Sequence, residues 1–171
     1  MPRAPHDQSG WLRAVDRAYA AAADGLGAER WLRQRAENRR PGERLAVVMG
    51  VDDVMVQTDF AGTSVLVPRS VRFAKTAHAL GYAVFFVTGR SYAHGLGRIE
   101  ALLNRAGVAA AWFCPPPAGV TDETTAKTTC RAAIRNDGYT LAMSVAADGA
   151  GLVGEPEAER VVRLPQYFPS S

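Results

Sequence analysis

The stretch "LAVVMGVDDVMVQTDF", residues 45–60, determines the fold class of this chain. Its first part, Leu45–Met49, is an uninterrupted apolar run, which is typical of a strand buried on both faces of a parallel sheet. Gly50 ends the run, and two adjacent carboxylates, Asp52 and Asp53, follow at once. In open α/β sheets the ligand crevice lies beyond the carboxyl ends of the strands. The stretch therefore predicts a buried strand that delivers acidic side chains to such a crevice.

The rest of the chain alternates helical and strand patterns around this stretch. Periodicity and flanking turn residues predict a helical segment over residues 10–38, with a break at Gly25 and Gly27. Further helices are predicted over 68–80, over 95–106, and from Thr121 or Asp122 to Asn136. Strands are predicted over 82–87, 108–113, 139–145 and 160–165. This alternation predicts an α/β, Rossmann-like fold with a parallel sheet flanked by helices. We expect one domain over residues 1–171, with an N-terminal helical segment over 1–42 and an α/β core over 43–171.

Composition and charge narrow the function classes. The chain has 171 residues and a net charge of +3, which is too weak a basic bias to indicate nucleic-acid binding. No apolar stretch approaches the ~20 residues of a membrane span. The first ten residues are polar and lack the apolar region of a signal peptide, so we expect a cytoplasmic protein.

Cys114 and Cys130 form no C-x-x-C pair, and we expect two unpaired thiols in a reducing compartment. The sequence leaves the oligomeric state open.

Three motifs in order along the chain carry a resemblance to a known family. They are "VFFVTGR" at residues 84–90, "KTTCRAAIRNDGY" at 127–139 and "AERVVRLPQY" at 158–167. Together they resemble the haloacid dehalogenase (HAD) superfamily, and within it the acid phosphatase branch of subfamily IIIB. The resemblance covers nearly the whole chain and implies a Rossmann-like HAD fold with a minimal cap.

The resemblance fails at the positions that carry the family's chemistry. In the family the first strand ends in D-x-D-[DEN]-T, and the first aspartate is the phosphoryl-accepting nucleophile and a magnesium ligand. Here that position is Gly50, and Val54 stands in place of the threonine. The fourth motif, G-[DN]-x-x-x-D, falls on residues 146–151, where Ala147 and Gly151 replace both metal-holding residues; Asp148, one residue away, leaves a local slip open. We predict no magnesium site, no phosphatase turnover and no cofactor.

Other functional positions of the family are retained. The resemblance assigns an acid–base role to Asp52, a phosphate-binding hydroxyl to Thr88 and a phosphate-binding ammonium to Lys127. Lys127 and Lys75 are the only lysines among 20 basic residues, which favours a need for a compact charge at position 127. Further ligand-binding candidates are Asp53, Arg90, Ser91, Tyr92 and His94.

Each retained residue also has a structural interpretation. Asp52 and Asp53 are equally suited to accept backbone N–H groups in the loop after the strand. Thr88 is suited to bond its own turn. Lys127 is suited to a salt bridge with Asp52, and His94 to a solvated loop position.

Two functions from different classes fit these residues. The first is a metal-independent acid/base enzyme of isomerase, dehydratase or cyclase type, acting on a small molecule in specialised metabolite biosynthesis. Asp52 would then sit in a drier pocket as general acid or base, with Thr88 and Lys127 holding an oxyanion or carbonyl. The alternative is a non-catalytic pseudophosphatase that binds an anionic ligand or a protein partner. A working phosphatase with another nucleophile is a third possibility.

Overall fold

The computed structural model describes residues 8–58, 64–88, 95–109, 112–114, 119, 122–147 and 157–167. Its centre is a five-stranded sheet in the order β5-β4-β1-β6-β7, and every neighbouring pair in it is parallel. The strands are β1 (Arg44–Gly50), β4 (Ala83–Val87), β5 (Trp112–Cys114), β6 (Tyr139–Ala146) and β7 (Arg160–Arg163). If only these five strands are numbered in chain order, the order across the sheet is 3-2-1-4-5, which is that of the Rossmann-like doubly wound fold. The predicted fold class is confirmed.

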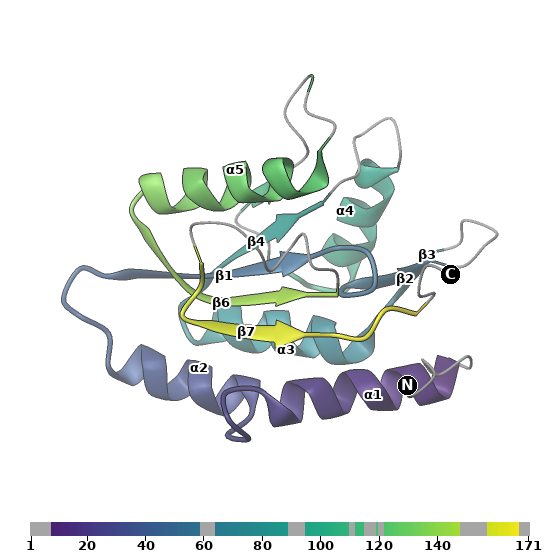
Figure 1. Cartoon of the computed structure of the whole chain (residues 1–171), viewed down its shortest axis with the longest axis horizontal. Coiled ribbons are helices and arrows are strands. Elements are labelled where there is room, and N and C mark those ends of the chain that lie inside the picture. The colour runs from purple at the N-terminus through teal and green to yellow at the C-terminus, as the bar shows by residue number, and fades with distance from the viewer. Residues whose placement is uncertain are drawn as a thin grey trace.

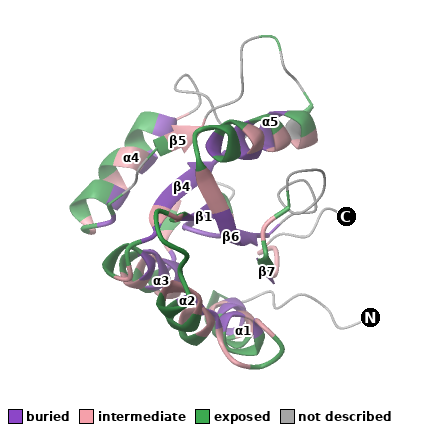
Figure 2. Ribbon diagram, turned by 90° about the vertical axis from the view of Figure 1, so that its left-hand side faces the viewer, coloured by how far each residue is buried: buried purple, intermediate pink, exposed green. Residues whose placement is uncertain are grey.

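Helices cover both faces of the sheet. They are α1 (Gln8–Ala21), α2 (Ala28–Glu37), α3 (Pro68–Ala79), α4 (Leu96–Arg105) and α5 (Glu123–Asn136). One core cluster joins the sheet to α1–α4, and a second joins the opposite face to α5. Figures 1 and 2 show this arrangement, with α5 across the sheet from α1, α2 and α3. None of the described helices combines the length and the apolar character of a transmembrane span.

The central strand β1 is buried on both faces, as its apolar run predicts. Leu45, Val47 and Met49 belong to the cluster that includes α1–α4, whereas Ala46 and Val48 belong to the cluster beneath α5. None of the five is more than 3% exposed. Because successive side chains of a strand point to opposite faces, one short run supplies both cores.

The N-terminal helices are fastened to the core by buried hydrogen bonds. The indole Nε1 of Trp11 donates to the carbonyl of Pro165 at 2.8 Å, and the hydroxyls of Tyr19 and Ser70 lie 2.7 Å apart. Tyr82 donates its hydroxyl to the carbonyl of Leu32 at 2.6 Å, and burial raises the pKa of Tyr82 to about 12. The described part of the segment predicted over residues 1–42, which begins at Gln8, therefore packs on the same core as the sheet.

Local signals located most elements, and one hairpin was missed. Pro68 occupies the first turn of α3, and Asp122 caps α5 by accepting the backbone N–H of Thr125 at 2.9 Å. The short strands β2 (Val56–Thr58) and β3 (Ser64–Leu66) pair antiparallel where the sequence indicated only a loop. Strands of three residues are too short to show a periodic pattern.

The expectation of two unpaired thiols was wrong. Cys114, at the end of β5, and Cys130, in α5, form a disulfide with their Cα atoms 6.1 Å apart. The pairing depends on α5 crossing back over the sheet, and nothing in the spacing of the two cysteines signals it. Disulfides persist mainly in oxidising compartments. The cysteines therefore no longer support the cytoplasmic location predicted from the sequence.

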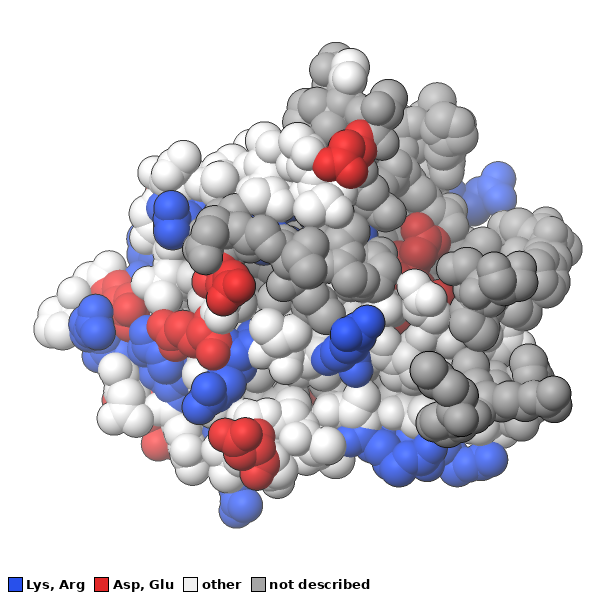
Figure 3. All heavy atoms as spheres, in the orientation of Figure 1, with Lys and Arg blue, Asp and Glu red and all other residues white. Residues whose placement is uncertain are grey.

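An ion-pair network joins α2 to the amino ends of the strands. Arg35 of α2 pairs with Glu43 at 2.9 Å and with Glu159 at 2.7 Å, and Thr140 donates its hydroxyl to Glu43 at 3.2 Å. Figure 3 shows acidic and basic side chains intermixed over this end of the molecule. Hydrogen bonds from Arg35 lower the pKa of Glu43 from 4.5 to about 2, although partial burial opposes the shift.

The Glu43 carboxylate is expected to make stability depend on pH in the acidic range. Its folded-state pKa is lowered, so its contribution is complete above the ordinary value of 4.5 and is lost as the pH falls toward about 2. Glu43→Gln should therefore lower the melting temperature at pH 7, and its difference from the wild type should shrink between pH 4.5 and 2. Glu37→Gln, an exposed change at the end of α2, is the control. A difference independent of pH would contradict this role for Glu43.

Candidate functional site at the carboxyl edge of the sheet

Three neighbouring strands end together at one edge of the sheet. Gly50 of β1 pairs with Val87 of β4, and Met49 pairs with Val145 of β6. The arrowheads in Figure 1 mark this edge, and the N-terminal end of α5 reaches it because α5 runs against the strands. The chain moves from β1 toward β4 on one side and toward β6 on the other, which makes this edge the switch point of the fold.

Position 50, where the sequence resemblance predicts the family's nucleophile, is bordered by an apolar side chain. A Cβ atom placed on Gly50 would lie 3.2 Å from Cγ2 of Val54 and 3.7 Å from the carbonyl oxygen of Val145. Val54 itself is fully buried. The first contact is tighter than ordinary packing, so any side chain at position 50 requires Val54 to move. The glycine at position 50 and the valine at position 54 are therefore coupled by packing.

A tight turn follows Gly50 and determines the direction of both carboxylates. The carbonyl of Val51 accepts the N–H groups of Met55 and Val56 at 3.0 and 3.1 Å. Asp53 has a φ of 59°, a left-handed conformation that aspartate adopts more readily than most residues. Its carboxylate accepts the backbone N–H of Tyr167 at 3.3 Å. Asp53 thus has the structural role that the sequence left open, tying residues near the end of the chain to the turn.

Asp52 is more exposed to solvent than the sequence hypothesis predicted. The sequence hypothesis put its carboxylate in a drier pocket, but Asp52 is exposed, whereas Val51 and Val54 on either side of it are buried. The backbone explains the difference, because Asp52 forms an isolated bridge with Val56 and the turn directs the valines inward. A carboxylate in this position is accessible to solvent and to a ligand at the edge.

The two residues that the sequence predicts to bind phosphate, Thr88 and Lys127, are buried. Thr88, which follows β4, is 2% exposed, and Lys127, in the N-terminal half of α5, is 5% exposed. Arg131 lies one turn after Lys127 and is 3% exposed, so two cations share one face of the helix. Burial lowers the pKa of Arg131, an effect that Glu157 opposes. Arg131 was missed as a site residue, although it is the last residue of the motif "KTTCR" that was noted in the sequence.

Several candidate residues lie outside the described part of the chain. They are Arg90, Ser91, Tyr92 and His94 after β4, and Asp148 and Gly151 after β6. Their roles stay predictions.

The described oxygen donors at this edge do not match a magnesium site. Mg²⁺ requires near-octahedral oxygen ligands, commonly including one or two carboxylates. Gly50 and Ala147 offer only backbone atoms, Asp52 is exposed, and the carboxylate of Asp53 already accepts a backbone bond. In the described ranges no three histidine, cysteine, aspartate or glutamate side chains gather as metal ligands do.

The fold is thus a doubly wound α/β domain, with Thr88 and Lys127 buried near the carboxyl edge of its sheet. The model of the HAD superfamily, subfamily IIIB (acid phosphatase), matches residues 58–170, and the chain belongs to this family. The match includes Thr88 and Lys127. It begins after the stretch that contains Gly50 and Val54.

Solved structures with a related fold share little sequence with the chain. The cobalt-bound deoxy-D-mannose-octulosonate 8-phosphate phosphatase of Haemophilus influenzae is 21% identical, with a TM-score of 0.44 over 64% of this chain and 62% of that one. A hypothetical protein from Xanthomonas campestris is 19% identical, with a TM-score of 0.42 over 76% of this chain and 65% of that one. The chain thus spans less than two thirds of each. No curated protein matches it.

The contact between positions 50 and 54 is open to a direct test. We expect Gly50→Ala to destabilise the protein by about 1 kcal/mol, because an added methyl group in a packed region forces its neighbours to shift. In a Val54→Ala background the same change should cost much less, because the close contact is then absent. Urea unfolding of the wild type, both single variants and the double variant measures this coupling. Additive effects would show that Val54 does not fill the position.

Proposed function

We propose that this chain is a HAD-fold protein that has lost phosphatase chemistry and binds a small oxyanion-bearing ligand without turning it over. The observation that carries the proposal is the contrast at the carboxyl edge. The nucleophile position, Gly50, is closed off by buried Val54, whereas Thr88 and Lys127 are kept in buried positions.

Loss of hydrolysis follows from the groups that the reaction requires. An aspartyl-phosphate forms when a carboxylate oxygen attacks phosphorus and the alcohol leaves, so the step needs a carboxylate at position 50. It also needs a divalent cation to neutralise charge on the transferred group. Position 50 is a glycine and supplies no carboxylate, and the described oxygen donors near Ala147 do not match a binding site for a divalent cation.

Binding of an oxyanion follows from the buried cations. An ammonium away from bulk water attracts an anion more strongly than an exposed one, because the effective dielectric constant is lower. Lys127 supplies such a charge, Arg131 on the same helix face supplies a second, and Thr88 adds a hydroxyl donor. The ligand class is therefore a small phosphate- or carboxylate-bearing molecule, with no metal or cofactor required.

The exposed carboxylate of Asp52 favours a second candidate function. A solvent-accessible acid at a ligand-binding edge is placed to exchange protons with a bound molecule. The protein would then be a metal-independent acid/base enzyme of isomerase, dehydratase or cyclase type in small-molecule biosynthesis. Asp52→Asn separates the candidates, since it should spare ligand binding in both but abolish turnover in the second.

The disulfide bears on where this function takes place. A Cys114–Cys130 bond is more stable in an oxidising compartment than in the cytoplasm. It therefore favours a secreted or periplasmic-type environment over the cytoplasmic one that the sequence predicted.

The lysines provide a matched pair of variants for testing the proposal. Lys127→Met removes the buried ammonium and should eliminate one oxyanion-binding event, or weaken it by at least about tenfold, because charge-assisted hydrogen bonds are the strong ones. Lys75→Met changes the exposed lysine of α3 and should leave that event intact. Titration calorimetry with phenyl phosphate at low ionic strength measures both, and circular dichroism confirms folding. Equal binding by the two variants, or no binding to the wild type, would refute the proposal.

A further inference from the structure

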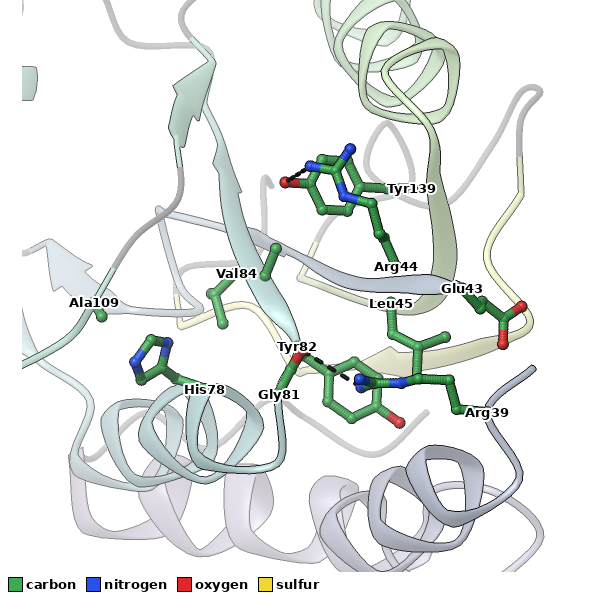
Figure 4. Close-up of a pocket in the computed structure, with 11 residues that line it drawn as sticks. Arg39, Glu43, Arg44, Leu45, His78, Gly81, Tyr82, Val84, Ala109 and Tyr139 are labelled. Carbon is green, nitrogen blue, oxygen red and sulfur yellow. Dashed lines mark hydrogen bonds between the residues drawn. The ribbon is translucent and has the colours of Figure 1, made fainter. Parts of the chain in front are cut away.

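A cavity of about 440 Å³ lies at the opposite edge of the sheet, away from the candidate site. Its walls come from the amino ends of β1, β4 and β6, the end of α3 and the connection before β1 (Figure 4). The volume falls within the ~300–1,000 Å³ range of small-molecule sites. The family's chemistry takes place at the carboxyl edge, so neither the family nor the proposed function above accounts for this cavity.

One wall of the cavity presents a fixed guanidinium group. The Cζ atom of Arg44 lies 4.0 Å from the centre of the Tyr139 ring, and Nη2 donates to the Tyr139 hydroxyl at 2.5 Å. Nη1 donates to the carbonyl of Asp137 at 3.1 Å. Ring stacking and a backbone acceptor hold the group without neutralising its charge. Figure 4 shows Arg44 and Tyr139 together on this wall.

A second guanidinium group lies across the cavity. Nη2 of Arg39 donates to the carbonyl of Gly81 at 3.4 Å. Gly81 has a φ of 92°, and a Cβ there would lie 3.1 Å from Nη2, so the absence of a side chain permits this close approach. Within the described ranges, neither Arg39 nor Arg44 forms an ion pair with a carboxylate.

The charge balance of the lining is positive. Glu43 is the single carboxylate among the lining residues, and both of its oxygens are engaged by Arg35, at 2.9 Å each. The imidazole of His78, at the end of α3, adds a further polar group (Figure 4). The floor is apolar, with Leu45 and Val84 both buried. Two cations without carboxylate partners above an apolar floor are complementary to an organic anion.

We propose that this cavity is a second ligand site, which binds a small organic oxyanion such as a phosphate monoester or a polycarboxylate. Arg39 and Arg44 donate to the anionic group, and the organic part lies against Leu45 and Val84. The fixed guanidinium groups favour planar, bidentate recognition of phosphate or carboxylate, which a lysine could not provide. The site differs from the carboxyl edge in position and in the residues that form it.

Amide shifts in NMR spectra of the labelled full chain test the proposal. Phenyl phosphate and citrate are titrated separately, so that the two sources of the anionic group are distinguished. We expect saturable shifts at Gly81, Ala83 and Tyr139 with at least one probe. The Arg39→Met/Arg44→Met variant should weaken this response by at least about tenfold. A wild type whose amides in this region do not respond to either probe would overturn the proposal.

Control variants separate this site from the other edge. Arg30→Met/Arg33→Met removes the same charge from exposed positions of α2 outside the cavity and should leave the affinity unchanged. Lys127→Met should abolish the amide shifts near Thr88 but keep those near Gly81. The proposed site at each edge of the sheet is therefore tested independently of the other. If the double methionine variant does not fold, Arg39→Lys/Arg44→Lys replaces it; unchanged affinity in that variant or in the methionine pair would also refute the proposal.

Discussion

The narrow space beside Gly50, bordered by buried Val54, is the constraint on which our account of the carboxyl edge depends. It lies at the end of β1, the strand on which the whole sheet is centred. A Cβ at position 50 would lie 3.2 Å from the valine, so this part of the edge is packed as core rather than left as a polar crevice. An apolar core has no place for an unpaired carboxylate, because burial of an isolated charge is costly. The absence of a side chain at position 50 and the burial of Val54 beside it are thus linked by packing.

The two edges of the sheet differ in how they hold positive charge. At the carboxyl edge Lys127 and Arg131 are buried in α5, where a charge requires a partner or a ligand. At the amino edge Arg39 and Arg44 are exposed and are held by backbone carbonyls and an aromatic ring. The carboxyl edge holds the residues for which we propose oxyanion binding, whereas the amino-edge cavity is built from residues outside the motifs that carry the resemblance.

Much of the fold follows from short signals in the sequence. The run Leu45–Met49 predicted the central strand, and the sequence offered Thr121 or Asp122 as the start of α5, of which Asp122 is the cap. The HAD family was predicted from motifs around Thr88 and Lys127, and it is confirmed. These signals are local, because burial on both faces, capping and turns each act within a few residues.

Other features depend on how distant segments meet, and the sequence could not show them. The Cys114–Cys130 bond requires α5 to lie over β5. The exposure of Asp52 depends on a turn whose direction is determined by hydrogen bonds to Val51. The amino-edge cavity combines Arg39 and Tyr139, which lie a hundred residues apart in the chain. A sequence shows which side chain stands at each position, but the surroundings of that side chain arise from the packing of distant segments.

Phosphorus NMR of a phosphate monoester mixed with the protein and magnesium tests the central claim most directly, because it detects binding and hydrolysis in one sample. We expect the ester signal to shift or broaden as the ligand binds, with no inorganic phosphate formed over many hours. Steady release of inorganic phosphate that depends on magnesium and on folded protein would contradict the loss of phosphatase chemistry.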